Sequence, residues 1–198
     1  MRLSSLLVCF GTAIMASSPG PVVLHIGPPA GGKTTQSSAL SKDLGILVVS
    51  VDELIAANQQ AFAKKSNAGT APLDPRVDPA VNRLVDEKLR SLDLSKGVIL
   101  DGYPAAAIHA DYLKHLLQEL GLPTPVIIHL QVPDDVVKKR LKGQQPSDAD
   151  QRLKDYHREL DFIRVYYPEA AIHDIDGTKS RDAIAKEIRN ILESGRSR

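Results

Sequence analysis

Short apolar runs alternate with longer amphipathic segments along most of the chain. Runs rich in β-branched residues predict buried strands at 22–26, 46–51, 97–102, 126–132 and 171–175. Apolar residues at helical spacing predict helices at about 35–44, 52–56, 79–92, 105–120, 133–141, 148–166 and 184–192. Strands that alternate with helices indicate an α/β fold, with a five-stranded parallel sheet that carries helices on both faces.

The ends of these strands are where chemistry is expected, because ligands of parallel sheets bind beyond the carboxyl ends of the strands. The segments that reach this edge are the loop after Ile26, residues 50–52, residues 101–103 and Pro133. Asp52 follows the second strand directly, and we expect it to cap the helix after that strand.

The segment after the first strand reads GPPAGGKT and occupies residues 27–34. It fits the phosphate-loop pattern G-x-x-x-x-G-K-[ST], in the strand–loop–helix context that the motif requires. Glycines let successive N–H groups turn toward phosphate oxygens, and the positive end of the next helix lies beneath them. Lys33 adds a full charge, and Thr34 or Thr35 offers a hydroxyl to Mg2+. The predicted phosphate-binding residues are Gly27, Ala30, Gly31, Gly32, Lys33, Thr34 and Thr35. A glycine-rich turn that binds nothing is the alternative.

Three other charged residues are candidates for phosphoryl-transfer chemistry. Asp101 ends a buried strand, where its carboxylate is placed to hold Mg2+ directly or through water; the alternative is a turn-forming role. Arg140 and Arg152 flank a short break at 143–147, and we predict that they stabilise the charge on a transferring phosphoryl group. Surface cations without such a role are the alternative for both.

The composition narrows the function classes. A length of 198 residues with 42% hydrophobic content suits one globular domain, which we expect to be a monomer. A net charge of +1 and 4% aromatic residues argue against a nucleic acid partner and a basic membrane-binding surface. Cys9 is the only cysteine, which excludes an internal disulfide and a cysteine-rich metal site. His25 and His129 are predicted core histidines, because no metal-ligand spacing accompanies them.

Residues 1–20 form an extension before the first strand. Arg2 is followed by a mostly apolar run up to Met15 and then by small residues, which is typical of a signal peptide. This run is too short to span a bilayer as a stable helix. Translation that starts at Met15 is another interpretation. We favour a cytoplasmic protein, because the phosphate loop implies a nucleotide found mainly inside cells, and export is the alternative.

These motifs together resemble the adenylate kinase family of nucleoside monophosphate kinases. The matching pieces, in the family's order, are 27–36, 50–54, 101–104, 140–143, 152–153 and 176–178. The resemblance implies a P-loop kinase domain at 21–195, with a helical acceptor-binding insertion at about 51–80 and a mobile lid at about 143–150. It also implies transfer of the γ-phosphoryl group of ATP to a nucleoside monophosphate, usually AMP, with Mg2+.

The acceptor side departs from the family pattern. The residues implied in acceptor binding are Ser50, Asp52, Tyr103 and His109, the last in place of a glutamine that reads adenine. The residues that stand where the family has arginines are Ile55, Ala105 and Gln144. Each lost charged donor costs about 1.5–3 kcal/mol of acceptor binding. Two alternatives therefore stay open: a kinase with a different small acceptor, such as an uncharged alcohol, and a nucleotide-binding protein with little transferase activity.

Overall fold

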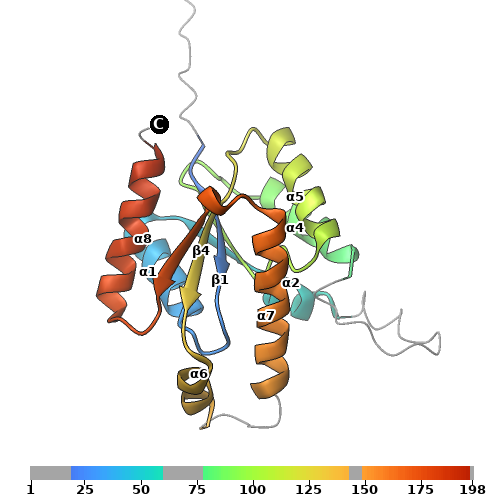
Figure 1. Ribbon diagram of the computed structural model, residues 1–198. Coiled ribbons are helices and arrows are strands. Elements are labelled where there is room, and N and C mark those ends of the chain that lie inside the picture. Colours follow the sequence, from blue (N-terminus) through green and yellow to red (C-terminus); the bar gives the residue numbers. More distant parts are fainter. Residues whose placement is uncertain (1–18, 60–77, 143–148, 197–198) are drawn as a thin grey trace, which may run out of the picture.

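A computed structural model describes residues 19–59, 78–142 and 149–196 (Figure 1). Most of the N-terminal extension, of the predicted acceptor insertion and of the predicted lid lies outside these ranges. The strands are β1 (Val22–Ile26), β2 (Leu47–Ser50), β3 (Val98–Asp101), β4 (Val126–Gln131) and β5 (Ile172–Asp176). The helices are α1 (Lys33–Leu44), α2 (Val51–Ala57), α4 (Ala80–Arg90), α5 (Ala107–Glu119), α6 (Asp134–Leu141), α7 (Ala149–Tyr166), the 3-10 turn η3 (Glu169–Ala171) and α8 (Arg181–Arg196). No helix in the described ranges has the length and apolar character needed to cross a membrane.

The sheet confirms the predicted α/β fold. Its strand order is β2-β3-β1-β4-β5, and every neighbouring pair is parallel. The register places Asp101 at the end of β3 opposite both His25 of β1 and Ser50 of β2. Because all strands run the same way, the loops that follow them gather at one edge. The phosphate loop and Asp101 therefore share one end of the molecule.

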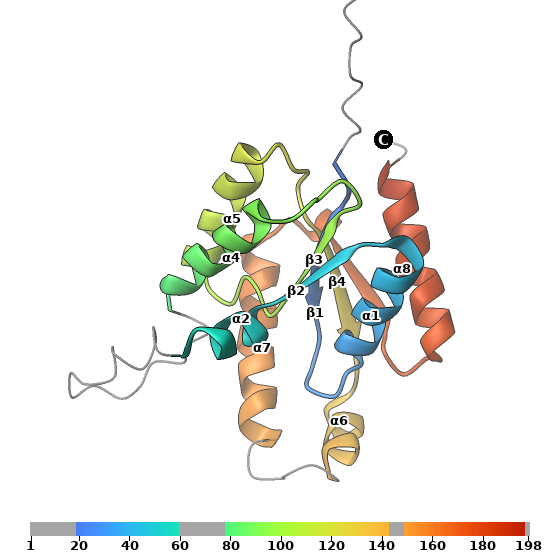
Figure 2. The ribbon, with the colours of Figure 1, turned by 180° about the vertical axis from the view of Figure 1, so that it is seen from behind.

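Helices cover both faces of the sheet, as Figures 1 and 2 show from opposite sides. Val22, Leu24 and Ile26 of β1 pack into a core with residues of α4, α5 and α7. Val23 points to the other face, where it joins a core formed with α1 and α8. The continuous apolar sequence of β1 follows from this arrangement, because a central parallel strand is buried on both sides.

Two helix starts differ from the sequence-based prediction. α1 begins at Lys33 and not at Thr35, because Gly32 with φ 103° ends the loop and the helix follows at once. The prediction that Asp52 caps α2 is wrong. Ser50 is the N-cap, and its hydroxyl accepts a hydrogen bond of 3.3 Å from the Glu53 N–H. Asp52 lies in the first turn, where its negative charge is still favourable to the helix dipole.

Candidate active site

The phosphate loop makes a tight turn between β1 and α1. The Gly31 N–H donates to the Pro28 carbonyl at 3.0 Å, and a Cβ on Gly31 would lie 2.8 Å from that oxygen. Gly32 adopts a positive φ, and so does Ala30, at 55°, a conformation that residues with a side chain rarely take. The turn therefore needs glycine at 31 and 32. It leaves the N-terminus of α1 open toward the loop, which suits an anion.

Lys33 is held at this loop by two carbonyl groups. Its Nζ donates to the Gly27 oxygen at 2.6 Å and to the Pro28 oxygen at 3.3 Å. Burial lowers the pKa of Lys33, while the carboxylates of Asp101 and Glu159 act in the opposite direction. The ammonium is therefore poorly solvated and close to the loop, where phosphate oxygens can become its acceptors.

Asp101 lies on one side of the loop, in a pocket of about 470 Å³. Burial raises the pKa of Asp101, and the positive charge of Lys33 opposes this shift. The pocket is lined by Thr34, Ser37, Ser38, Ser41, Lys42, Val48, Ser50, Glu53 and Asp101. Carboxylate and hydroxyl oxygens are suitable ligands for Mg2+. In the described residues no group of three or more His, Cys, Asp or Glu side chains could hold a metal ion, so Mg2+ would also need phosphate and water oxygens here.

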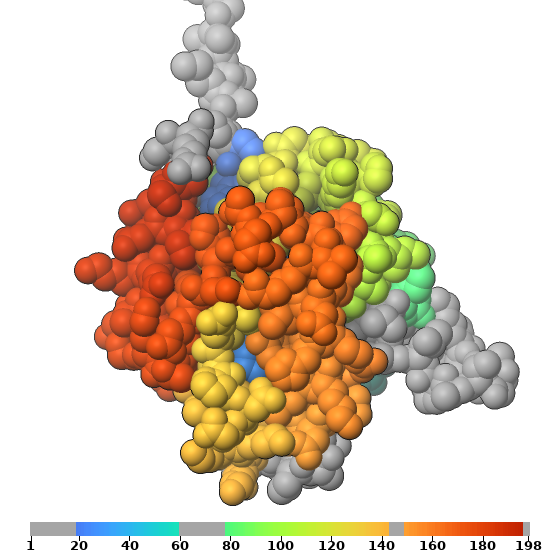
Figure 3. All heavy atoms as spheres, in the orientation of Figure 1, coloured from blue at the N-terminus to red at the C-terminus, as the bar shows by residue number. Residues whose placement is uncertain are grey.

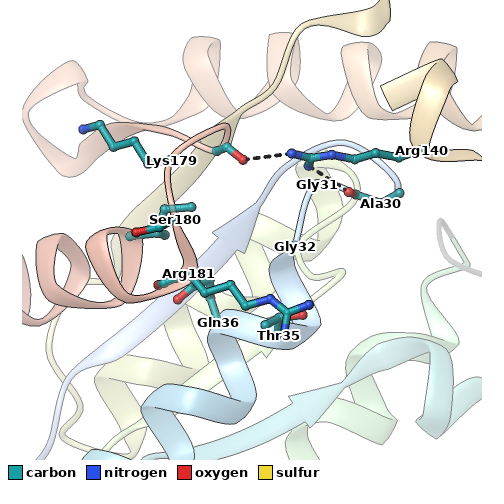
Figure 4. Close-up of a pocket in the computed structure, with 11 residues that line it drawn as sticks. Ala30, Gly31, Gly32, Thr35, Gln36, Arg140, Lys179, Ser180 and Arg181 are labelled. Carbon is teal, nitrogen blue, oxygen red and sulfur yellow. Dashed lines mark hydrogen bonds between the residues drawn. The ribbon is translucent and has the colours of Figure 1, made fainter. Parts of the chain in front are cut away.

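A second pocket, of about 440 Å³, lies on the other side of the loop (Figure 4). Arg140 of α6 spans its edge, with Nη1 3.2 Å from the Ala30 oxygen and Nη2 3.4 Å from the Gly177 oxygen. Gly177 follows β5 and packs so closely that a Cβ would lie 2.5 Å from Val132. Arg140 thus joins the phosphate loop to the loop between β5 and α8, two segments far apart in the sequence.

The start of α7 brings further charges to the same edge. Arg152 is exposed in the first turns of α7, and Glu159 lies two turns later. The charge of Arg152 lowers the pKa of Lys33 and that of Glu159 raises it, so this helix acts electrostatically on the loop. In the space-filling view, blue atoms of the early chain are visible in a hollow between the yellow segment around α6 and the orange α7 (Figure 3). Lys33, Asp101, Arg140 and Arg152 therefore all lie around one edge of the sheet.

Comparison with protein families assigns this arrangement. The family profile described as adenylate kinase matches residues 25–172, which is more than half of the chain. The chain belongs to the adenylate kinase family. It is thus a nucleoside monophosphate kinase.

Curated adenylate kinases are similar over most of their length. The adenylate kinase of Mesorhizobium japonicum is 30% identical over 189 residues, which cover 86% of this chain and 96% of the relative. The adenylate kinase of Mycobacterium bovis is 31% identical over 170 residues, with 82% and 93% covered. That of Micrococcus luteus is 28% identical over 188 residues, with 88% and 92% covered. The similarity therefore extends over most of this chain and over most of each relative.

The residues implied in acceptor binding fall into two groups. Ser50 lines the Asp101 pocket and Asp52 is exposed in α2, so both are open to a ligand. Tyr103 and His109 are each 0% exposed, with their rings stacked at 5.2 Å. The Tyr103 hydroxyl donates to Asn82 Oδ1 at 2.7 Å. Neither Tyr103 nor His109 lines either pocket, so in this structure both act inside the core of the adenylate kinase fold.

The structure also brings forward residues that sequence reasoning missed. Gln36 and Arg181 line the pocket under Arg140, and Gln36 Nε2 donates to the Arg181 carbonyl at 3.1 Å. One signal was available, because Arg181 follows the fifth strand and β5 ends at the same edge as the others. His25 is buried as predicted, with Nδ1 2.8 Å from Ser37 Oγ. Its Nε2 has no hydrogen-bond partner among the described residues, which the sequence did not indicate.

Proposed function

We propose that this adenylate kinase family member transfers the γ-phosphoryl group from Mg2+-bound ATP to AMP and releases two ADP. The observation that carries the proposal is the position of Lys33, whose ammonium lies at the carbonyls of Gly27 and Pro28 beside Asp101. A lysine in this position can neutralise phosphate charge, because its ammonium is poorly solvated and bonds to neutral carbonyl groups.

The phosphate loop holds the donor nucleotide. Backbone N–H groups of Gly32 and Lys33 bind the phosphates, with the dipole of α1 behind them. The nucleoside end extends into the pocket under Arg140, because the pocket on the other side of the loop contains Asp101. The family and the cationic lining of this pocket support ATP as the donor.

Thr34 and Asp101 are the residues proposed to hold Mg2+. Both line the same pocket, and one hydroxyl and one carboxylate leave the remaining positions of the ion to phosphate and water oxygens. When bound, the ion neutralises charge on the donor phosphates. The carboxylate of Asp101 must be ionised for this role, and the nearby charge of Lys33 favours that form.

The reaction needs positioning and charge stabilisation and no covalent intermediate with the protein. A phosphate oxygen of AMP forms a bond to the γ-phosphorus while the bond from that phosphorus to the β–γ bridging oxygen breaks, and the electron pair leaves with ADP. Lys33, Arg140 and Arg152 are proposed to stabilise the charge that develops on the transferred group. Arg152 is exposed on α7 and free to approach this group.

Two described positions on the acceptor side lack the arginine that the resemblance implies. Ile55 and Ala105 offer no charge, and Ile55 packs against the apolar core of the α4, α5 and α7 face. Ser50 and Asp52 are the accessible acceptor candidates, while Tyr103 and His109 shape the region from inside. We therefore expect AMP to bind more weakly than ATP, because a charged donor to phosphate contributes about 1.5–3 kcal/mol.

A coupled assay of ADP release tests this function. The wild-type protein is assayed with Mg2+ and ATP against AMP, other nucleoside monophosphates, nucleosides and simple alcohols. Turnover with AMP above the rate without acceptor is the expected result. ADP release with a nucleoside or an alcohol and not with AMP would identify a different acceptor. ATP binding without ADP release for any acceptor would leave a nucleotide-binding protein and contradict the proposal.

A further inference from the structure

The pocket under Arg140 is lined by several positively charged side chains. Its lining residues are Ala30, Gly31, Gly32, Thr35, Gln36, Arg140, Gly177, Lys179, Ser180, Arg181 and Ile184. Three of them carry a positive charge and none is an aspartate or a glutamate. α1 begins at this pocket and so does α8, whose first residue is Arg181. Both the side chains and the two helix dipoles therefore favour an anion here.

Arg181 differs from the other cations nearby because its side chain has no partner among the described residues. Lys179 forms an ion pair with Glu187 at 2.9 Å, and Arg189 of the same helix pairs with Asp43 at 2.7 Å. Arg140 donates to two backbone carbonyls. Arg181 makes no side-chain hydrogen bond or ion pair with any residue in 19–59, 78–142 and 149–196. A guanidinium has several donors in a fixed planar fork, so this one is available to a ligand.

The backbone of Arg181 is fixed relative to the phosphate loop. Gln36 of α1 donates to its carbonyl at 3.1 Å, and Gln36 itself is 2% exposed. Figure 4 shows the Arg181 side chain running toward Thr35, and both residues line the pocket. Thr35 lies in the first turn of α1, two residues after Lys33. The guanidinium is thus directed to the start of the helix that receives the phosphates, on the side where the nucleoside leaves the loop.

We propose that Arg181 is a second phosphate-binding cation of the donor site, which binds the α-phosphate of the nucleoside triphosphate. This inference rests on the proposed donor site at the phosphate loop. Lys33 acts at the far end of the triphosphate and Arg181 at the end next to the ribose. Recognition through a phosphate is independent of the base, so Arg181 contributes to affinity for the triphosphate and not to selection of adenine.

Arg181→Ala tests this role, with Lys186→Ala as the matched control. Lys186 is an exposed cation of the same helix that does not line the pocket. Dissociation constants for ATP are measured by calorimetry at low and high salt, and inorganic triphosphate is measured by competition. Loss of a charge-assisted hydrogen bond should weaken ATP and triphosphate binding roughly 10-fold or more in Arg181→Ala and reduce the salt dependence. Lys186→Ala should bind like wild type, and Arg181→Lys should recover part of the loss.

Several results would overturn the inference. Wild-type affinity in Arg181→Ala would remove any role in donor binding. A loss for ATP with no loss for inorganic triphosphate would indicate a contact to the base or ribose instead. Lys33→Ala is measured in parallel: if it loses ATP while Arg181→Ala does not, the donor site stands and only the Arg181 assignment is wrong. If the wild type binds neither ATP nor triphosphate, both proposals fail. Circular dichroism of each variant verifies that it is folded.

Discussion

The hydroxyl of Tyr156 lies 2.7 Å from Nε2 of His129, and this contact ties α7 to the centre of the sheet. On the other side of the ring, Nδ1 lies 2.6 Å from Asp174 Oδ1. Burial opposes ionisation of Asp174, but hydrogen bonds from Arg164 and His129 lower its pKa, so it is a carboxylate that only accepts. Burial lowers the pKa of His129, so the ring is neutral. Nδ1 must then donate to Asp174, and Nε2 accepts the Tyr156 hydroxyl.

Tyr156→Phe should therefore destabilise the fold. The substitution leaves Nε2 of His129 buried without a donor, at a cost of about 1–3 kcal/mol. Denaturant unfolding gives this difference in the free energy of unfolding. Tyr166→Phe is the control on the same helix, because the Tyr166 hydroxyl donates to Asp111 at a more exposed position. It should cost roughly 0.5–1 kcal/mol; equal losses for the two variants would argue against a special role for the buried contact.

Acid should reduce stability through His25. Burial and the charge of Lys33 lower the pKa of His25 from 6.5 to about 3. Below pH 6.5 the unfolded chain binds a proton at this residue and the folded chain does not, so the free energy of unfolding falls as the pH drops from 6.5 toward 3. The double variant His25→Leu/Ser37→Ala removes the histidine and its hydroxyl partner. Between pH 6.5 and 3, the free energy of unfolding of this variant should fall less steeply with pH than that of the wild type, by up to about 1.4 kcal/mol per pH unit. Equal slopes for the variant and the wild type would contradict the prediction.

Lys33→Ala should abolish turnover with little change in fold. Within the described ranges, the side chain hydrogen-bonds to two loop carbonyls and to no other group. Its proposed role is to stabilise phosphate charge, so the expected loss in kcat is roughly 100-fold or more. The coupled assay gives the rate, and thermal unfolding verifies the fold. Lys186→Ala is again the control, since Lys186 is exposed on α8 away from the site. Unchanged turnover in Lys33→Ala would sink the donor-site assignment.

Asp101→Asn should remove the acid limb of the pH–rate profile. In the protein without Mg2+, burial raises the pKa of Asp101, so its carboxylate becomes protonated at a higher pH than that of an exposed aspartate. The acid limb is therefore measured in kcat/KM, which reports the free enzyme. Rates that require the ionised form then fall with falling pH through that pKa. The asparagine keeps the shape of the side chain and loses its charge. The variant should therefore be slower and should need a higher Mg2+ concentration to reach its maximal rate. A variant with the wild-type Mg2+ dependence would show that Asp101 does not hold the ion.

The sequence by itself determined the sheet, the phosphate loop and the family. Local rules were sufficient for these features, because β-branched runs, glycines at fixed spacing and a lysine before a helix each act over a few residues. The sequence also predicted that the phosphate loop and Asp101 lie at the same edge of the sheet, because parallel strands place their carboxyl ends at one edge. Family membership then made the donor chemistry predictable.

The tertiary structure alone decided which of these residues a ligand can reach. Tyr103 and His109 lie in motif positions that imply acceptor contact, yet packing buries both completely. His129 contacts Asp174, which lies 45 residues later in the chain, and Arg140 donates to the carbonyl of Ala30, which lies 110 residues earlier. No local sequence pattern encodes contacts over such separations. Arg181 looks like an ordinary helix-surface cation until β5 and α8 place it in the pocket beside the loop. Burial and pairing depend on contacts between distant segments, and therefore only the folded chain fixes them.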